Sequence, residues 1–173
     1  MKTFENANFP MTQDGRTYHV GTCKGETANR IITVGDPARA ERIAGLLDEI
    51  SVRVTSKRGF TTITGLYKGT PVSIVSIGMG ISMMDFFLRE VRATIDGPMY
   101  CIRLGSCGSI SEEAKIGNIV IAESAVLIQR NVNAFSTDTK DVDQPHYSIS
   151  LPFKADEQLT QKVIYLFNRF SLF

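Results

Sequence analysis

The sequence has no tryptophan, only three cysteines in 173 residues and no apolar run long enough to cross a bilayer. The cysteines are spaced neither as metal ligands nor as a disulfide framework, which is typical of reduced thiols in the cytoplasm. The N-terminus lacks the apolar core of a signal peptide. Net charge is also nearly absent, at +1 from 19 basic and 18 acidic residues. These absences predict a cytoplasmic protein with no metal, no membrane partner and no nucleic-acid partner.

Short apolar strands alternate with amphipathic helices from residue 31 onward. The alternation predicts an α/β fold with a mixed, mostly parallel twisted sheet, helices on both faces and one antiparallel hairpin. Residues 1–17 are expected to form an N-terminal arm and residues 18–173 to belong to a single domain. The expected strands are 31–34, 51–55, 60–67, 71–77 and 99–102, with one or two more over 119–122 and 125–128. The expected helices are 37–48, 82–95 with Ser82 as its cap, and 156–168.

Arg103 is the most informative residue, because it ends a predicted strand and is followed at once by a loop of small residues, 104–109. Backbone N–H groups in such a loop can converge on an anion, and a guanidinium adds a fork of donors. Ligands of open α/β sheets bind at this edge of the sheet. The segment therefore predicts an anion site.

Two further strand ends carry glycine loops, at 35–39 and 78–80, and the first also contains Arg39. Two arginines, a helix N-terminus and a loop of free N–H groups favour phosphate as the anion. An alternative for each segment alone is a simple helix start at 35–39 and a surface salt bridge at Arg103. A dinucleotide fold is disfavoured, because Met83 stands where its third glycine belongs.

Five segments together resemble the nucleoside phosphorylase-I family, most closely its uridine phosphorylases. Each segment is weak alone, but their common order and spacing are specific for the family. The match extends from residue 18 to about residue 165. The segments are 18–21 (YHVG), 35–39 (GDPAR), 56–61 (SKRGFT), 76–80 (SIGMG) and 103–108 (RLGSCG).

The resemblance implies a pentosyltransferase of nucleoside salvage. Inorganic phosphate would attack C1′ of a nucleoside, giving ribose 1-phosphate and a free base, with no cofactor beyond phosphate as co-substrate. In this family the phosphate would be bound by the residues that match here as Gly35, Arg39, Arg58, Arg103 and Ser106. Arg103 and Ser106 would also position the transition state, in which the sugar resembles an oxocarbenium ion.

The resemblance also implies how the nucleoside would be held and how subunits would assemble. Ser106 would bridge phosphate and ribose, Met79 would lie near the sugar, and Cys107 and Gly108 would lie near the base. His19 would contact the ribose 5′-hydroxyl. His19 and Arg58 would serve a neighbouring subunit's site, so a homo-oligomer is expected, either a dimer or a hexamer built of dimers. From the residues alone, His19 also fits a solvated loop, Met79 a packing role and Cys107 a small filler.

The sequence departs from the family pattern in two ways. Gly59 stands where bacterial uridine phosphorylases have a Glu that helps hold a monovalent cation, which leaves that cation site in doubt. The Met-Glu pair that grips ribose and the Gln-x-Arg pair that grips uracil are absent, because the family domain continues beyond residue 173. Two alternatives to a uridine phosphorylase therefore stay open. One is a purine nucleoside phosphorylase, and the other is a non-catalytic truncated paralogue or fragment that binds phosphate or a full-length partner.

Overall fold

The computed structural model describes residues 8–135 and 145–170, so the first seven residues of the expected arm lie outside the described residues. The chain divides into two compact units after Cys107, and each unit is described by itself. None of the helices in the described ranges is long and apolar enough to cross a membrane.

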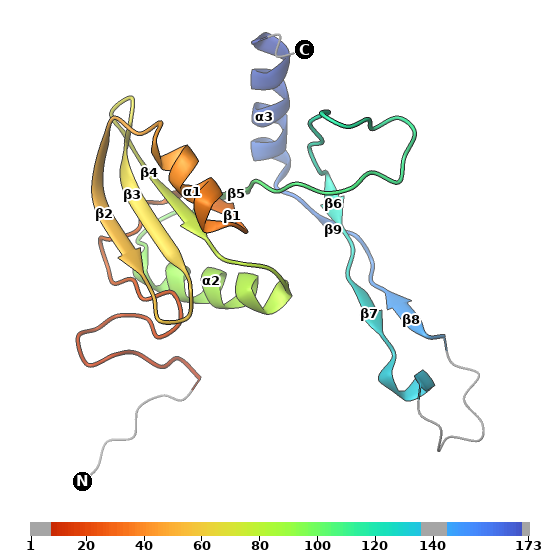
Figure 1. The fold of residues 1–173 in the computed structure, drawn as a ribbon, viewed down its shortest axis with the longest axis horizontal. Coiled ribbons are helices and arrows are strands. Elements are labelled where there is room, and N and C mark those ends of the chain that lie inside the picture. The colour runs from red at the N-terminus through yellow and green to blue at the C-terminus, as the bar shows by residue number, and fades with distance from the viewer. Residues whose placement is uncertain (1–7, 136–144, 171–173) are drawn as a thin grey trace. The chain divides into compact units, whose positions relative to one another are not determined.

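A five-stranded mixed sheet forms the centre of the first unit (Figure 1). Its strands lie in the order β2-β3-β4-β1-β5. β1 pairs in parallel with β4 and β5, whereas β2–β3 and β3–β4 are antiparallel. The expected mixed α/β sheet is confirmed, with its parallel part at β4-β1-β5. Its antiparallel part is larger than the one expected hairpin, because β2 also pairs with β3 in the antiparallel sense. The strand bounds are β1 (Arg30–Val34), β2 (Glu49–Thr55), β3 (Thr61–Tyr67), β4 (Thr70–Ser76) and β5 (Tyr100–Arg103).

The predicted hairpin is confirmed as β3 and β4, joined by Lys68 and Gly69. Both loop residues have positive φ, at 49° and 74°. A two-residue loop of this kind matches the right-handed twist of the strands, and glycine adopts it without a steric penalty. The turn therefore fixes the register in which Tyr67 pairs with Thr70.

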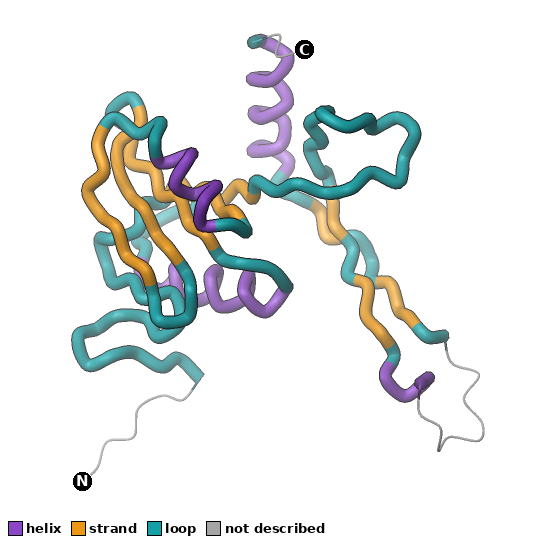
Figure 2. The backbone as a smooth tube through the Cα atoms, in the orientation of Figure 1, coloured by secondary structure: helices purple, strands orange, loops and turns teal. Residues whose placement is uncertain are grey.

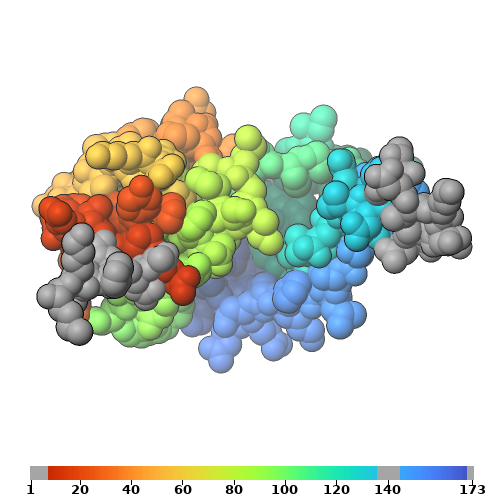
Figure 3. Space-filling model, turned by 90° about the horizontal axis from the view of Figure 1, so that it is seen from below, coloured from red at the N-terminus to blue at the C-terminus, as the bar shows by residue number. Residues whose placement is uncertain are grey.

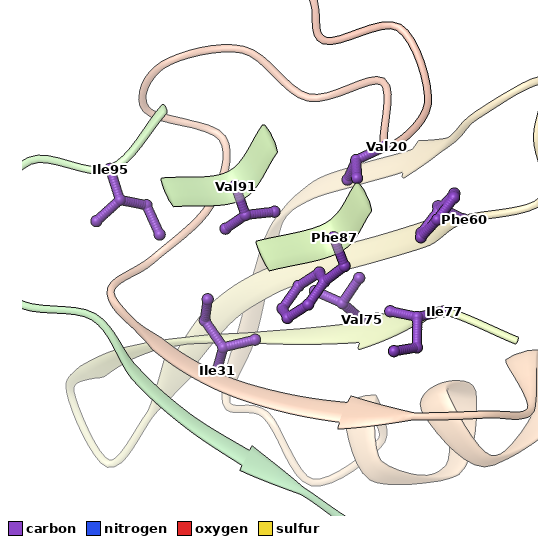
Figure 4. Close-up of a cluster of buried hydrophobic side chains, with 8 residues drawn as sticks. All are labelled: Val20, Ile31, Phe60, Val75, Ile77, Phe87, Val91 and Ile95. Carbon is purple, nitrogen blue, oxygen red and sulfur yellow. The ribbon is translucent and has the colours of Figure 1, made fainter. Parts of the chain in front are cut away.

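Helices α1 (Pro37–Ala44) and α2 (Ile81–Thr94) cover opposite faces of this sheet. Alternation along β1 divides its side chains, so that Ile31 packs under α2 and Val34 under α1. The α1 cluster contains Val34, Ala40, Ala44, Ile63 and Ile74. The larger α2 cluster is drawn in Figure 4 and contains Val20, Ile31, Phe60, Val75, Ile77, Phe87, Val91 and Ile95.

Two predicted helix boundaries are wrong. Helix α1 begins as expected, with the Asp36 side chain accepting from the N–H of Ala38, but it ends at Ala44 rather than at residue 48. Gly45 forms its C-cap, and Leu46 is 68% exposed because the chain turns there towards β2. In α2 the N-cap is Gly80 at φ 95°, so the helix begins before Ser82 and no side chain caps it.

A hydrogen bond from Thr64 Oγ1 on β3 to the carbonyl of Glu26, at 2.7 Å, joins the segment before β1 to the sheet. Within this segment Arg16 and Glu26 form an ion pair, with N···O distances of 2.6 and 2.7 Å. Hydrogen bonds from this guanidinium hold the pKa of Glu26 below its ordinary value. The segment also lies beside α2 (Figure 3), where Arg89 donates to the carbonyl of Asn8 at 2.8 Å. Asn8 is thereby placed next to a helix that lies more than 70 positions further along the chain.

The described residues of the second unit form two short strand pairs, a 3-10 turn and one helix. β6 (Ser124–Ala125) pairs with β9 (Phe153–Lys154), and β7 (Ile128–Arg130) pairs with β8 (Tyr147–Ile149). The turn is η1 (Val132–Phe135). Helix α3 (Glu157–Arg169) begins one residue after its expected start, and Asp156 is its N-cap.

The strand predicted over 119–122 is wrong, since no helix or strand lies between β5 and β6 (Figure 2). Ile119 and Val120 are exposed, and no strand in the described part of the chain lies against them to pair with their backbone. The second predicted strand, 125–128, is divided between β6 and β7. An apolar run forms a strand only where a neighbour supplies hydrogen bonds, which local sequence does not specify.

Candidate functional site

Three strand ends meet at one edge of the sheet in the first unit. Gly35 follows β1, Gly78 follows β4 and Arg103 ends β5, and these three strands are parallel neighbours. The N–H of Gly78 donates to the carbonyl of Gly35 at 3.1 Å, and the N–H of Leu104 donates to that of Thr33 at 2.9 Å. The topology therefore places the predicted anion-binding residues at the carboxyl edge, where open α/β sheets bind ligands.

The guanidinium of Arg103 lies beside Gly35. Its Nη1 donates to Thr33 Oγ1 at 3.4 Å, because Thr33 and Arg103 are paired in the parallel ladder. A Cβ on Gly35 would lie 3.7 Å from Nη2 of Arg103 and 3.3 Å from the carbonyl oxygen of Gly78. The distance to the guanidinium is an ordinary van der Waals contact, whereas the distance to the Gly78 carbonyl is tight. Glycine at position 35 therefore eases the close approach of the β1 and β4 strand ends, and its φ is not in the left-handed region.

A second arginine reaches the loop that follows β5. Arg39 lies in the first turn of α1 and donates from Nη2 to Ser106 Oγ at 3.3 Å. The backbone N–H groups of Gly105, Ser106 and Cys107 make no hydrogen bond within the described residues. The structure therefore brings four predicted phosphate residues to this edge: Gly35, Arg39, Arg103 and Ser106.

Neither Arg39 nor Arg103 has a carboxylate partner among the residues that the structure describes. Arg103 therefore does not form the surface salt bridge considered as an alternative. Two unneutralised guanidinium groups, the N-terminus of α1 and free backbone N–H groups make this edge electropositive. Such an arrangement can bind a phosphate through several charge-assisted hydrogen bonds.

Met79 lies in the loop between Gly78 and Gly80, next to the same edge, and is 88% exposed. It therefore does not take the packing role considered for it. Met83 and Met84 do pack against the α2 cluster. Gly108 begins the second unit.

Arg58 and His19 lie away from this edge, and neither contacts the residues around Arg103. Arg58 stands in the β2–β3 turn and donates from Nη2 to the Tyr18 hydroxyl at 3.2 Å, with its guanidinium 5.3 Å from that ring's centre. Arg58 and Tyr18 line an open groove of about 770 Å³ that is also lined by Lys57 and Arg53. The Nδ1 of His19 lies 2.5 Å from the buried carboxylate of Glu90.

Sequence reasoning missed two residues that hold these side chains. Thr33 supports Arg103, and only the β1–β5 register, which is tertiary, reveals it. Glu90 supports His19, and here a signal was present. A glutamate three residues after Phe87 and just before Val91 lies on the apolar face of an amphipathic helix, where a charge needs a partner.

The cysteines differ in their environment. Burial raises the pKa of the Cys101 thiol to about 11 and also raises that of Cys23, whereas Cys107 is exposed beside Ser106. Since the thiolate is the nucleophile, we expect iodoacetamide at about pH 8 to alkylate Cys107 first and Cys101 only as the pH approaches that pKa. Peptide mass spectrometry of timed samples measures this order. Equal rates at Cys101 and Cys107 in the folded protein would contradict it, and unfolding in urea should abolish the difference.

No cluster of three or more potential metal ligands occurs among the described residues. The residues at the edge are instead donors that suit an anion.

The chain is similar in sequence to known proteins. The model of the "Phosphorylase superfamily" matches residues 29–166. A uridine phosphorylase of Thermococcus kodakarensis is 34% identical over 129 residues, which cover 75% of this chain and 46% of that protein. A purine nucleoside phosphorylase of Lactococcus lactis is 36% identical over 129 residues, which cover 75% and 53%. The chain thus spans about half the length of the curated relatives it matches.

A solved structure is also similar to this chain over most of its length. It comes from a study of uridine phosphorylases in the oomycete Phytophthora capsici, and it superimposes with a TM-score of 0.88 at 37% identity. The match covers 95% of this chain and 56% of the other. A nucleoside phosphorylase of Trypanosoma brucei, which shows uridine phosphorylase activity, matches with a TM-score of 0.54 at 32% identity.

Proposed function

Because this chain belongs to the phosphorylase superfamily, we propose that the protein carrying it is a nucleoside phosphorylase that cleaves uridine with inorganic phosphate. Phosphate would attack C1′, forming the C1′–O bond as the glycosidic C1′–N bond breaks, and the base would leave with the bonding electrons and take up a proton. The products are ribose 1-phosphate and uracil. No cofactor is proposed beyond phosphate itself.

The observation that carries this proposal is the unneutralised pair Arg39 and Arg103 beside Gly35. A phosphate bound between these groups would be fixed and oriented for attack, and positioning of a nucleophile supplies a large part of such a rate enhancement. Arginine suits this task better than lysine, since its planar fork binds two phosphate oxygens at once. Ser106, which accepts from Arg39, would lie where its hydroxyl can reach both phosphate and sugar.

A shared site between subunits is part of the proposal. Arg58 and His19 make no contact with the Arg103 edge, so in a monomer they would have no part in phosphate or ribose binding. We propose a homo-oligomer, at least a dimer, in which each subunit lends these two residues to its neighbour. The protein is proposed to act in the cytoplasm.

Two other functions are supported by specific observations. Purine nucleoside phosphorylases are as similar to this chain as the uridine enzymes are, at 36–39% identity, which favours a purine substrate as the second candidate. The phosphate-binding residues at the edge would equally serve a non-catalytic form that binds phosphate or a full-length partner, which is the third candidate.

Incubation with nucleoside and phosphate tests the function. With the longest natural form of the protein, we expect uracil release from uridine that requires phosphate, measured by chromatography. Inosine under the same conditions is the comparison, and a strong preference for it would replace uridine by a purine. No base released from either nucleoside, together with retained phosphate binding by calorimetry, would leave the non-catalytic function.

A further inference from the structure

Glu90 is a charged residue inside an apolar helix face. It stands on α2 between Phe87 and Val91, both fully buried, and is itself only 4% exposed. A buried carboxylate is costly unless donors surround it. The burial of Glu90 therefore requires hydrogen-bond donors around its carboxylate.

Its donors come from the segment before β1, about 70 residues away. Oε2 accepts from the N–H groups of Val20 at 2.7 Å and His19 at 3.0 Å. Oε1 lies 2.5 Å from the ring Nδ1 of His19. The two backbone donors identify the carboxylate as an acceptor, and a carboxylate accepts but does not donate when ionised. The proton between the two side chains is therefore on Nδ1 of His19.

When the ring is neutral, this proton fixes the chemistry of the other ring nitrogen. In a neutral imidazole with Nδ1–H, Nε2 carries a lone pair and is a hydrogen-bond acceptor. Nε2 of His19 makes no hydrogen bond within the described residues, and the side chain is 21% exposed. Phe86 stacks on the ring at 3.9 Å between centres, and the Tyr18 ring meets it edge-on at 5.2 Å. The ring is thus held on several sides with one acceptor open.

We propose that Glu90 is a positioning residue that presents Nε2 of His19 as an acceptor to a hydroxyl group of the bound nucleoside. The carboxylate sets the tautomer and, through the two backbone N–H groups, the place of the ring. Identifying the hydroxyl as one of a nucleoside rests on the proposed function, whereas the tautomer does not. Glu90 need not touch the substrate to act in this way.

The substitution Glu90→Gln tests this proposal, because it keeps the shape of the side chain and replaces one acceptor oxygen by a donor. The amide oxygen can take the position of Oε2 and accept from the backbone of His19 and Val20. The amide NH₂ then faces Nδ1, which must become an acceptor, so the proton moves to Nε2. Gln is nearly isosteric with Glu, and the variant therefore reverses the tautomer with little change in packing.

Nitrogen NMR of the histidine rings measures the tautomer directly. The chain has only two histidines, so the variant His19→Asn assigns the signals. At about pH 8, we expect a protonated Nδ1 and a bare Nε2 in the wild-type protein and the reverse in Glu90→Gln. Asp85→Asn is the matched control, because it removes an exposed carboxylate from the same helix and should leave both signals unchanged.

The wild-type spectrum decides the proposal even if the variant does not fold. A ring protonated on Nε2, or on both nitrogens, would overturn it, as would a folded Glu90→Gln protein with an unchanged tautomer. Turnover tests the ligand separately. Glu90→Gln should raise KM for uridine by about tenfold, the equivalent of one hydrogen bond, and leave KM for 5′-deoxyuridine unchanged. An equal loss with both substrates overturns the hydroxyl contact, whereas no uridine cleavage by the wild-type protein refutes the proposed function and leaves the tautomer to be judged by NMR.

Discussion

Replacement of Arg103 by Ala should lower the kcat/KM of phosphorolysis on the order of 10²–10³-fold, the loss typical of removing one preorganised group that stabilises charge in a transition state. The guanidinium lies beside Gly35, has no carboxylate partner in the described residues and is fixed by Thr33. Its donors are thus free for a phosphate. Arg103→Lys should lie between the wild type and Ala, because an ammonium keeps the charge but not the bidentate fork.

The control for this prediction is Arg30→Ala. Arg30 begins β1, at the opposite end of the sheet from Arg103, and it donates only to the neighbouring Asn29. The Arg30→Ala variant removes the same charge but changes no residue near Arg103, so steady-state rates should stay near the wild-type value. Calorimetric titration with inorganic phosphate gives a second measurement that does not depend on turnover. Phosphate binding and kinetics that survive Arg103→Ala would show that the anion binds elsewhere.

Replacement of Phe87 by Ala should lower the free energy of unfolding by about 3–5 kcal/mol, the usual cost of truncating a buried aromatic residue. Phe87 is fully buried and stands at the centre of the cluster that joins α2 to the sheet (Figure 4). Its loss removes contacts with Val75 and Ile77, residues of the segment that leads to Gly78. A urea denaturation curve, followed by circular dichroism, measures the change.

The neighbouring residue provides the matched comparison. Leu88 lies on the same helix but is 38% exposed, so Leu88→Ala should cost less than about 1 kcal/mol. A similar loss for both variants would mean that the packing of α2 does not determine stability.

The sequence predicted those parts of the fold that depend on local chemistry. The Asp36-Pro37 helix start, the Lys68-Gly69 hairpin and the last helix near residue 156 are confirmed, since each is determined by a few adjacent residues. The end of α1 and the strand at 119–122 were wrong, because each depends on what the chain packs against. In the site, the arginines and glycines could be named from their motifs. Thr33 could not, because its partner Arg103 lies 70 residues away. For Glu90, its place on the apolar face of α2 signals that a partner is needed but does not identify His19 as that partner, which lies 71 residues away.

The placement of Arg103 by the β1–β5 ladder has a consequence for how this sequence can vary. β5 has only four residues, and its alternating side chains point to opposite faces of the sheet. A shift of one residue against β1 would turn Arg103 to the other face and bring Leu104 opposite Thr33. A single-residue insertion or deletion within β5 therefore removes the Arg103 side chain from the site, although the residue is still present in the sequence. The turn around Gly97, which lies outside the ladder, can change length without this penalty.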